Sequence, residues 1–160
     1  MQNKNLSLKE TFSIAIENYK KKNFELAENL CNKILSIDSN HSDSMMLLAN
    51  MYAINKNFQK AKDFLIQANK IQPKNLAILN NLGTAHKELG EIKKSTSFYE
   101  EILKINPDHA NANYNLGIAF YNKKEFATSK YFFQKTTEVQ PNYALAFMNL
   151  ANIYAEEKDY

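Results

Sequence analysis

The chain of 160 residues carries 20 lysines, no arginine, 17 acidic residues and 22 asparagines, for a formal net charge of +3. A single cysteine, three glycines and three prolines exclude a disulfide framework, a multi-cysteine zinc site and a glycine-rich phosphate loop. No apolar run approaches the ~18 residues of a membrane span, and the start Met-Gln-Asn-Lys lacks the apolar core of a signal peptide. We therefore expect a helical, cytoplasmic protein with no membrane segment and no cofactor.

A period of 34 residues runs through the chain. Pro73, Pro107 and Pro141 are spaced by 34 residues, and so are Gly83 and Gly117. Such a period is the sequence signature of a repeat architecture. With each proline counted as position 32 of its repeat, the chain divides into a lead-in, four repeats and a partial fifth. These segments are residues 1–7, 8–41, 42–75, 76–109, 110–143 and 144–160.

Within each repeat the apolar residues predict two helices. Positions 4, 7, 8 and 11 form one stripe at 3.6 residues per turn, as Leu79, Leu82, Gly83 and His86 do in the third repeat. The second helix runs to about position 30, because the proline at position 32 cannot continue it. Lysine holds position 15 in every repeat except the third, and we expect it in the last turn of the first helix, where it favours the negative end of the dipole. In chain order the breaks between the paired helices fall at residues 22–23, 56–57, 90–91 and 124–125.

Several fixed columns resemble the tetratricopeptide repeat. In the third repeat the matching residues are Asn81, Leu82, Gly83, Ser95, Tyr99 and Pro107. Asn18 and His86 depart from the usual aromatic residue at position 11, and Ser39 replaces the proline of the first repeat. The resemblance covers residues 8–160. It implies an all-α, right-handed superhelical solenoid of antiparallel helix pairs, with a concave groove lined by the first helix of each pair.

The face of each first helix opposite the core stripe is the predicted peptide groove. Asparagine recurs at position 6 as Asn81, Asn115 and Asn149, and its amide can both donate to and accept from a peptide backbone. This row is similar to the asparagine ladders in the repeat regions of protein O-linked sugar transferases. The alternative explanation is that asparagine is frequent throughout this chain. The groove candidates are Asn50, Asn80, Asn81, Tyr114, Asn115, Ile118, Tyr121, Met148, Asn149 and Asn152.

No group of residues predicts catalysis or a metal site. His41 and His109 hold the same position two repeats apart, so they cannot share a site, and His86 is expected to pack partly buried. Cys31 lies on the core side with no base beside it. A clamp for a terminal carboxylate is not expected, because Lys9 is the only basic residue at the helix positions that would form it. Nucleic-acid binding is not expected either, since arginine, the preferred bidentate ligand of guanine and phosphate, is absent.

The partial fifth repeat leaves an apolar helix without a partner. Phe147, Leu150, Ile153 and Tyr154 on the predicted helix 144–158 face the place of a second helix. A longer native protein, self-association through this face and a tolerated open end would each account for this. The sequence predicts a non-catalytic protein-protein interaction module that binds an extended peptide or partner helix. The alternative is the N-terminal substrate-recruiting region of a larger enzyme of sugar- or sulfo-transferase type, with its catalytic domain beyond residue 160.

Overall fold

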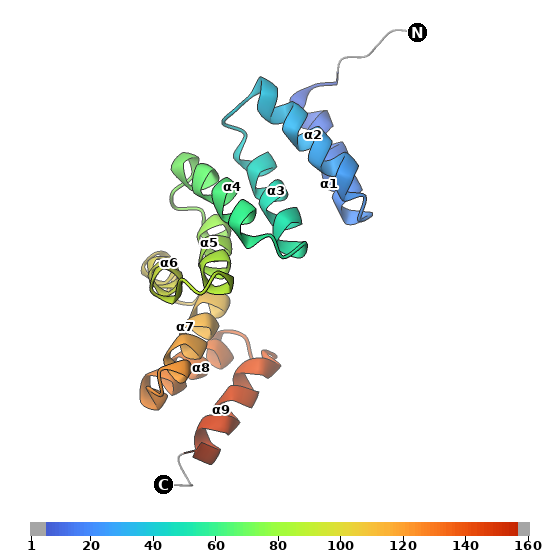
Figure 1. Ribbon diagram of the computed structural model, residues 1–160. Helices are drawn as coiled ribbons and strands as arrows, with labels where there is room; N and C mark the ends of the chain where they lie inside the picture. The colour runs from blue at the N-terminus through green and yellow to red at the C-terminus, as the bar shows by residue number, and fades with distance from the viewer. Residues whose placement is uncertain (1–5, 157–160) are drawn as a thin grey trace. The chain divides into compact units, whose positions relative to one another are not determined.

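The computed structural model describes residues 6–156, and within that range the regular structure is entirely helical, as predicted (Figure 1). The helices that open the repeats, here called A helices, are α1 (Leu8–Lys20), α3 (Ser42–Ile54), α5 (Leu76–Glu88), α7 (Ala110–Asn122) and α9 (Ala144–Glu156). The B helices that follow them are α2 (Phe24–Ile37), α4 (Phe58–Ile71), α6 (Ile92–Ile105) and α8 (Phe126–Val139). Each B helix ends at position 30, as the proline column predicted. Among these helices none is long and apolar enough to cross a membrane.

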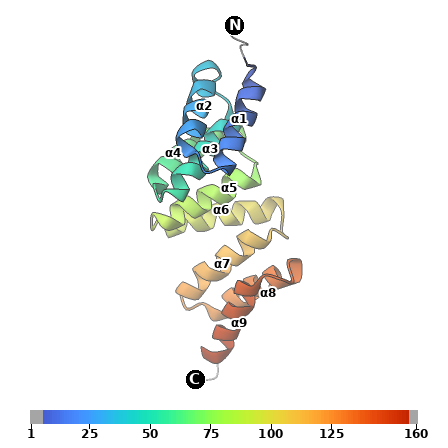
Figure 2. The same ribbon diagram turned by 90° about the vertical axis from the view of Figure 1, so that its right-hand side faces the viewer.

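The helices form two compact units, and the boundary between the units falls inside α5. The first unit ends at Ile78 and the second begins at Leu79. In the first unit α1 packs on α2, α2 on α3, and α3 on α4. In the second unit α6 packs on α7, α7 on α8, and α8 on α9 (Figure 2). Within each unit these helices therefore pack on their neighbours in sequence, as expected of stacked hairpins.

The residue before each of the first four A helices caps that helix. Ser7 forms a capping box with Glu10 at the start of α1. At the following junctions the backbone N–H of Ser44 donates to His41 Nδ1 at 3.1 Å. The N–H of Ala77 likewise donates to Asn75 Oδ1 at 3.0 Å, and that of Ala112 to His109 Nδ1 at 3.2 Å. These side chains satisfy N–H groups that have no partner within the helix, which gives two of the three histidines a local structural role.

The turn inside each hairpin requires one residue with a left-handed backbone. Lys22, Lys56 and Lys124 have φ values of 62°, 58° and 62°, and Gly90 has a φ of 75°. The expectation that lysine at position 15 lies in the last helical turn is therefore wrong. These lysines follow the helix end and reverse the chain direction, a position that usually favours glycine because it lacks a Cβ.

The third and fourth repeats fit a glycine of the A helix against an aromatic ring of the B helix. A Cβ placed on Gly117 would lie 2.6 Å from Cε1 of Phe133, and one on Gly83 would lie 2.6 Å from Cε1 of Tyr99. Beside the first pair, the Ser129 hydroxyl donates to the carbonyl of Gly117 at 2.8 Å. Glycine at position 8 therefore leaves the space that the ring at position 24 occupies.

The first two repeats use a different combination at the same positions. Alanine replaces glycine at position 8, and the residue at position 24 is smaller than an aromatic ring. The corresponding residues are Ala15 with Cys31, and Ala49 with Leu65. All four are buried. The smaller residue at position 24 of the B helix is thus matched by alanine, which is larger than glycine, at position 8 of the A helix.

A second pair of columns stacks aromatic rings between the two helices of a hairpin. Position 11 of the A helix meets a phenylalanine at position 23 of the B helix in three successive repeats. The pairs are Tyr52 with Phe64 at 5.7 Å, His86 with Phe98 at 5.3 Å, and Phe120 with Phe132 at 5.5 Å between ring centroids. His86 is 4 % exposed, so the imidazole takes the place of the usual aromatic ring and is buried more deeply than predicted.

Candidate functional site

The predicted groove corresponds to the surface made by positions 2, 5, 6, 9, 12 and 13 of the A helices, here called the A face. In the first unit this surface has a hollow of about 230 Å³ between α1 and α3. Phe12 and Ile16 of α1 line it together with Met46, Leu47 and Asn50 of α3, and Asp43 completes the lining. An apolar wall with one amide and one carboxylate suits an apolar side chain whose backbone is held by a hydrogen bond.

The second unit has a smaller hollow of about 100 Å³ where α5, α6 and α7 meet. Lys87 comes from α5, and Ile92 and Ser95 come from the first turn of α6. The residues from α7 and the turn after it are Asn115, Ile118, Ala119, Asn122 and Lys123. Two predicted groove residues, Asn115 and Ile118, therefore line one hollow, in company with two lysines that the sequence interpretation did not select.

The ladder residues Asn115 and Asn149 are each oriented by their own helix. The Asn115 amide N–H donates to the carbonyl of Asn111 at 2.8 Å, and that of Asn149 donates to the carbonyl of Leu145 at 2.7 Å. The side-chain oxygen of Asn115 accepts from Lys87 Nζ at 3.3 Å. Since an amide has two N–H donors and two acceptor lone pairs, Asn115 retains one donor and one lone pair for a ligand.

Asn149 and Tyr114 are brought together by packing between α7 and α9. Asn149 is only 8 % exposed, and its amide donates to the Tyr114 hydroxyl at 3.4 Å. The Tyr114 ring lies 4.9 Å from the ring of Tyr143, and Tyr121 packs 5.6 Å from Phe126. These aromatic candidates therefore contribute to the hydrophobic packing of the second unit as well as to its A face.

The remaining candidates differ in how accessible they are. Met148 is 53 % exposed and Asn152 is also exposed, both on α9. Asn80 and Asn81 are partly buried on α5. The side-chain oxygen of Asn80 is buried and has no hydrogen-bond partner among the described residues. Asn50 belongs to the hollow of the first unit.

The last helix is less open than predicted. Leu150 and Ile153 were expected to await a partner helix, but they are 8 % and 0 % exposed because they pack in a cluster with Phe133. Phe147 and Tyr154 are 50 % and 44 % exposed, so only these two of the four apolar residues remain accessible to a partner. Residues 157 and 158 of the predicted helix lie outside the described residues.

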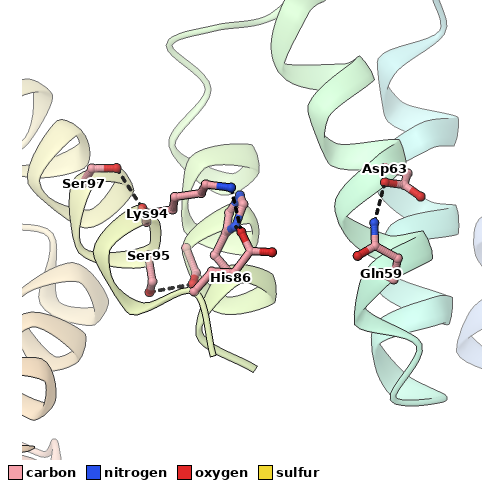
Figure 3. A network of polar contacts seen from close by, with 8 residues as sticks. Gln59, Asp63, His86, Lys94, Ser95 and Ser97 are labelled. Atoms are coloured by element: carbon pink, nitrogen blue, oxygen red, sulfur yellow. Dashed lines mark hydrogen bonds and ion pairs between the residues drawn. The ribbon is translucent and has the colours of Figure 1, made fainter. Parts of the chain in front are cut away.

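Cys31, His86 and Glu91 have structural roles. Cys31 is fully buried, and burial raises the pKa of its thiol to about 11. It is therefore protonated at neutral pH and is a poor nucleophile. His86 Nδ1 lies 2.8 Å from Glu91 Oε2, which also accepts from Lys94 at 2.9 Å (Figure 3). Among the described residues no cluster of three His, Cys, Asp or Glu side chains could hold a metal ion.

Comparison with known families agrees with the hairpin geometry. Residues 42–75 and 76–109 each match the family model for the tetratricopeptide repeat. The chain contains tetratricopeptide repeats. Among curated proteins, none matches this sequence.

Solved structures with tetratricopeptide repeats resemble the whole described chain. MamA from Desulfovibrio magneticus RS-1 is 16 % identical with a TM-score of 0.85, and the match covers 95 % of this chain and 86 % of that one. YrrB, described as a tetratricopeptide protein with an unusual peptide-binding site, is 22 % identical with a TM-score of 0.80, covering 95 % and 78 %. PilF from Pseudomonas aeruginosa is 21 % identical with a TM-score of 0.83, covering 96 % and 70 %. At these identities the likeness concerns the fold, and it confirms the all-α tetratricopeptide solenoid.

Proposed function

We propose that the chain is a non-catalytic protein-protein interaction module that binds an extended peptide or a partner helix on its A faces. The observation that carries the proposal is the hollow between α1 and α3. There Phe12, Ile16 and Met46 remain partly exposed and line a depression open to a ligand. Apolar side chains gathered in a depression, with an amide beside them, are typical of a binding site for a peptide side chain.

The family and the chemistry of the side chains support this proposal. Tetratricopeptide proteins bind proteins or peptides, and YrrB is described as having a peptide-binding site. Scaffolds of this type are typically non-catalytic, and the protonated, buried thiol of Cys31 fits a non-catalytic module. The partner is a protein rather than a nucleic acid, because the chain has no arginine to make bidentate contacts with bases or phosphates. No observation in residues 6–156 favours the alternative of a recruiting region for a transferase.

The asparagines of the A face are proposed to hold the peptide backbone. Asn115 has one N–H and one lone pair left after its contacts with Asn111 and Lys87. A peptide amide running past it could use both. Asn81 extends this row, and Asn149, whose amide N–H groups donate to Leu145 and Tyr114, offers its side-chain oxygen. In the first unit, the hollow between α1 and α3 takes an apolar side chain.

Selection from a displayed peptide library, followed by affinity measurements on the selected peptide, tests the proposal. Alanine at Asn81, Asn115 or Asn149 should weaken binding about twofold to tenfold each, the equivalent of one hydrogen bond. Asn142→Ala is the matched control, because Asn142 is exposed in the loop between α8 and α9. Circular dichroism must show each variant folded, since Asn149 also makes internal hydrogen bonds. If no peptide is selected the proposal fails, and if all three variants bind as the wild type does the ladder fails.

The exposed part of α9 is proposed to mediate weak self-association. Phe147 and Tyr154 are about half exposed on one helix face, and a second copy could cover them. Light scattering should therefore show an apparent mass that rises with protein concentration, and Phe147→Ser should reduce that rise. A strict monomer at high concentration contradicts this role.

A further inference from the structure

The hollow where α5, α6 and α7 meet combines apolar walls with an excess of positive charge. Ile92 and Ile118 provide aliphatic surface, Asn115 and Asn122 provide amides, and Lys87 and Lys123 provide two ammonium groups. None of the described residues that line it is acidic. The hollow thus differs in charge from that of the first unit, which has Asp43 in its wall.

The two ammonium groups are held mainly by neutral groups. Lys87 Nζ lies 3.3 Å from the side-chain oxygen of Asn115, whereas its carboxylate neighbour Glu88 is 3.8 Å away. That ion pair is at the limit of contact and about 40 % exposed, so solvent screens it strongly. Lys123 Nζ lies 4.9 Å from the ring centroid of Phe120, a contact that orients the charge without neutralising it.

The placement of Lys87 is built into the fold. The Asn115 N–H donates to the carbonyl of Asn111, which turns the side-chain oxygen of Asn115 toward α5 and gives Lys87 an acceptor. The nearby carboxylate of Glu91 is already engaged by His86 and Lys94. A positively charged site therefore remains beside aliphatic surface, which is complementary to a carboxylate at the end of a short methylene chain.

We propose that this hollow is a subsite for a glutamate or aspartate side chain of the bound peptide. The carboxylate lies between Lys87 and Lys123, and its methylene groups pack on Ile92 and Ile118. This inference rests on the proposed peptide binding and adds the chemical class of the partner: a segment with an acidic residue. It also differs from a clamp for a chain terminus, because the recognised group is a side chain.

The test uses the full chain and peptides whose C-termini are amidated, so that a terminal carboxylate cannot bind. The probe is an acidic peptide selected from a displayed library, and its partner is the same peptide with glutamine in place of glutamate or asparagine in place of aspartate. On the wild type the neutral peptide should bind about threefold to tenfold more weakly, as for a partly screened charge-assisted contact. On the double variant Lys87→Met/Lys123→Met the two peptides should bind equally.

Matched control variants and a local readout separate this role from a general effect of charge. Lys93→Met/Lys104→Met removes two exposed lysines of α6 that do not line the hollow, and it should keep the preference for the acidic peptide. The backbone amide resonances of Ile118 and Asn122 should shift on binding of the acidic peptide. The inference is overturned if selection gives peptides without acidic preference, or if the preference survives in Lys87→Met/Lys123→Met. Either result leaves the proposed peptide binding in place, whereas a failure to select any peptide overturns both.

Discussion

Replacing Gly117 by alanine should destabilise the protein, although alanine is the better helix former. The added Cβ would lie 2.6 Å from Cε1 of Phe133, a ring that is fully buried. Carbon atoms in normal contact are about 3.5–4.0 Å apart, so the ring or α7 must move by about 1 Å. Overpacking of this kind costs about 1–3 kcal/mol, against a gain of about 1 kcal/mol in helix propensity. We expect Gly117→Ala to lower the free energy of unfolding by about 1 kcal/mol.

The same substitution should have the opposite sign once the ring is removed. The second repeat already pairs Ala49 with Leu65 at these two positions. In a Phe133→Leu background, Gly117→Ala should therefore raise the free energy of unfolding by up to about 1 kcal/mol. Urea denaturation followed by far-ultraviolet circular dichroism on the four proteins of the cycle measures the coupling, expected at about 2 kcal/mol. Equal effects of Gly117→Ala in the two backgrounds, or stabilisation of the wild type, would refute the steric argument.

Three further predictions concern the caps and turns. Burial lowers the pKa of His109 below its usual 6.5, so the folded state favours the neutral imidazole that caps α7. The stability that this neutral cap contributes is present above pH 6.5 and is lost as the pH falls through the lowered pKa. His109→Asn, a cap that does not titrate, should reduce the difference between urea midpoints at pH 7 and pH 5; an unchanged difference would exclude His109 as its source. Lys124→Gly should stabilise the protein by about 0.5–1 kcal/mol, because it relieves a left-handed backbone, and a lower melting temperature would contradict this. Ser7→Ala should cost about 1 kcal/mol by removing the cap of α1, seen as faster hydrogen exchange in its first turn; unchanged exchange would argue against the cap.

The hairpins could be predicted from sequence because several independent columns give the same register. Proline marks the end of the B helices α4, α6 and α8, whereas α2 ends at the same repeat position with Ser39 in place of proline. The small residues at position 8 mark the close approach of the paired helices. Only one partner in the stack of His86 on Phe98 could be predicted. Position 11 was identified as the place of an aromatic ring, but the sequence does not show which residue of the B helix the ring contacts, so position 23 was not identified. The left-handed turns were missed because lysine is not the residue that this backbone normally selects.

The groove candidates were harder to predict than the helices. The position 6 asparagines were found by their spacing, but periodicity could not say that Asn149 is buried against Tyr114. Nor could it associate Lys87 with Asn115, which lie 28 residues apart in the sequence and 3.3 Å apart in space. Part of the asparagine excess has a plain local cause, as Asn57 and Asn75 cap the helices that follow them.

The caps also determine where a repeat can be cut and transplanted. A segment that starts at Ser42 loses His41, and one that starts at Ala110 loses His109, although these residues hold the first turns of α3 and α7. The exchangeable unit is therefore displaced by one residue from the unit defined by the prolines: it begins with the cap, at 41, 75 or 109. Chimeras or designed arrays joined at these residues would keep each helix start intact, whereas joints one residue later would fray it.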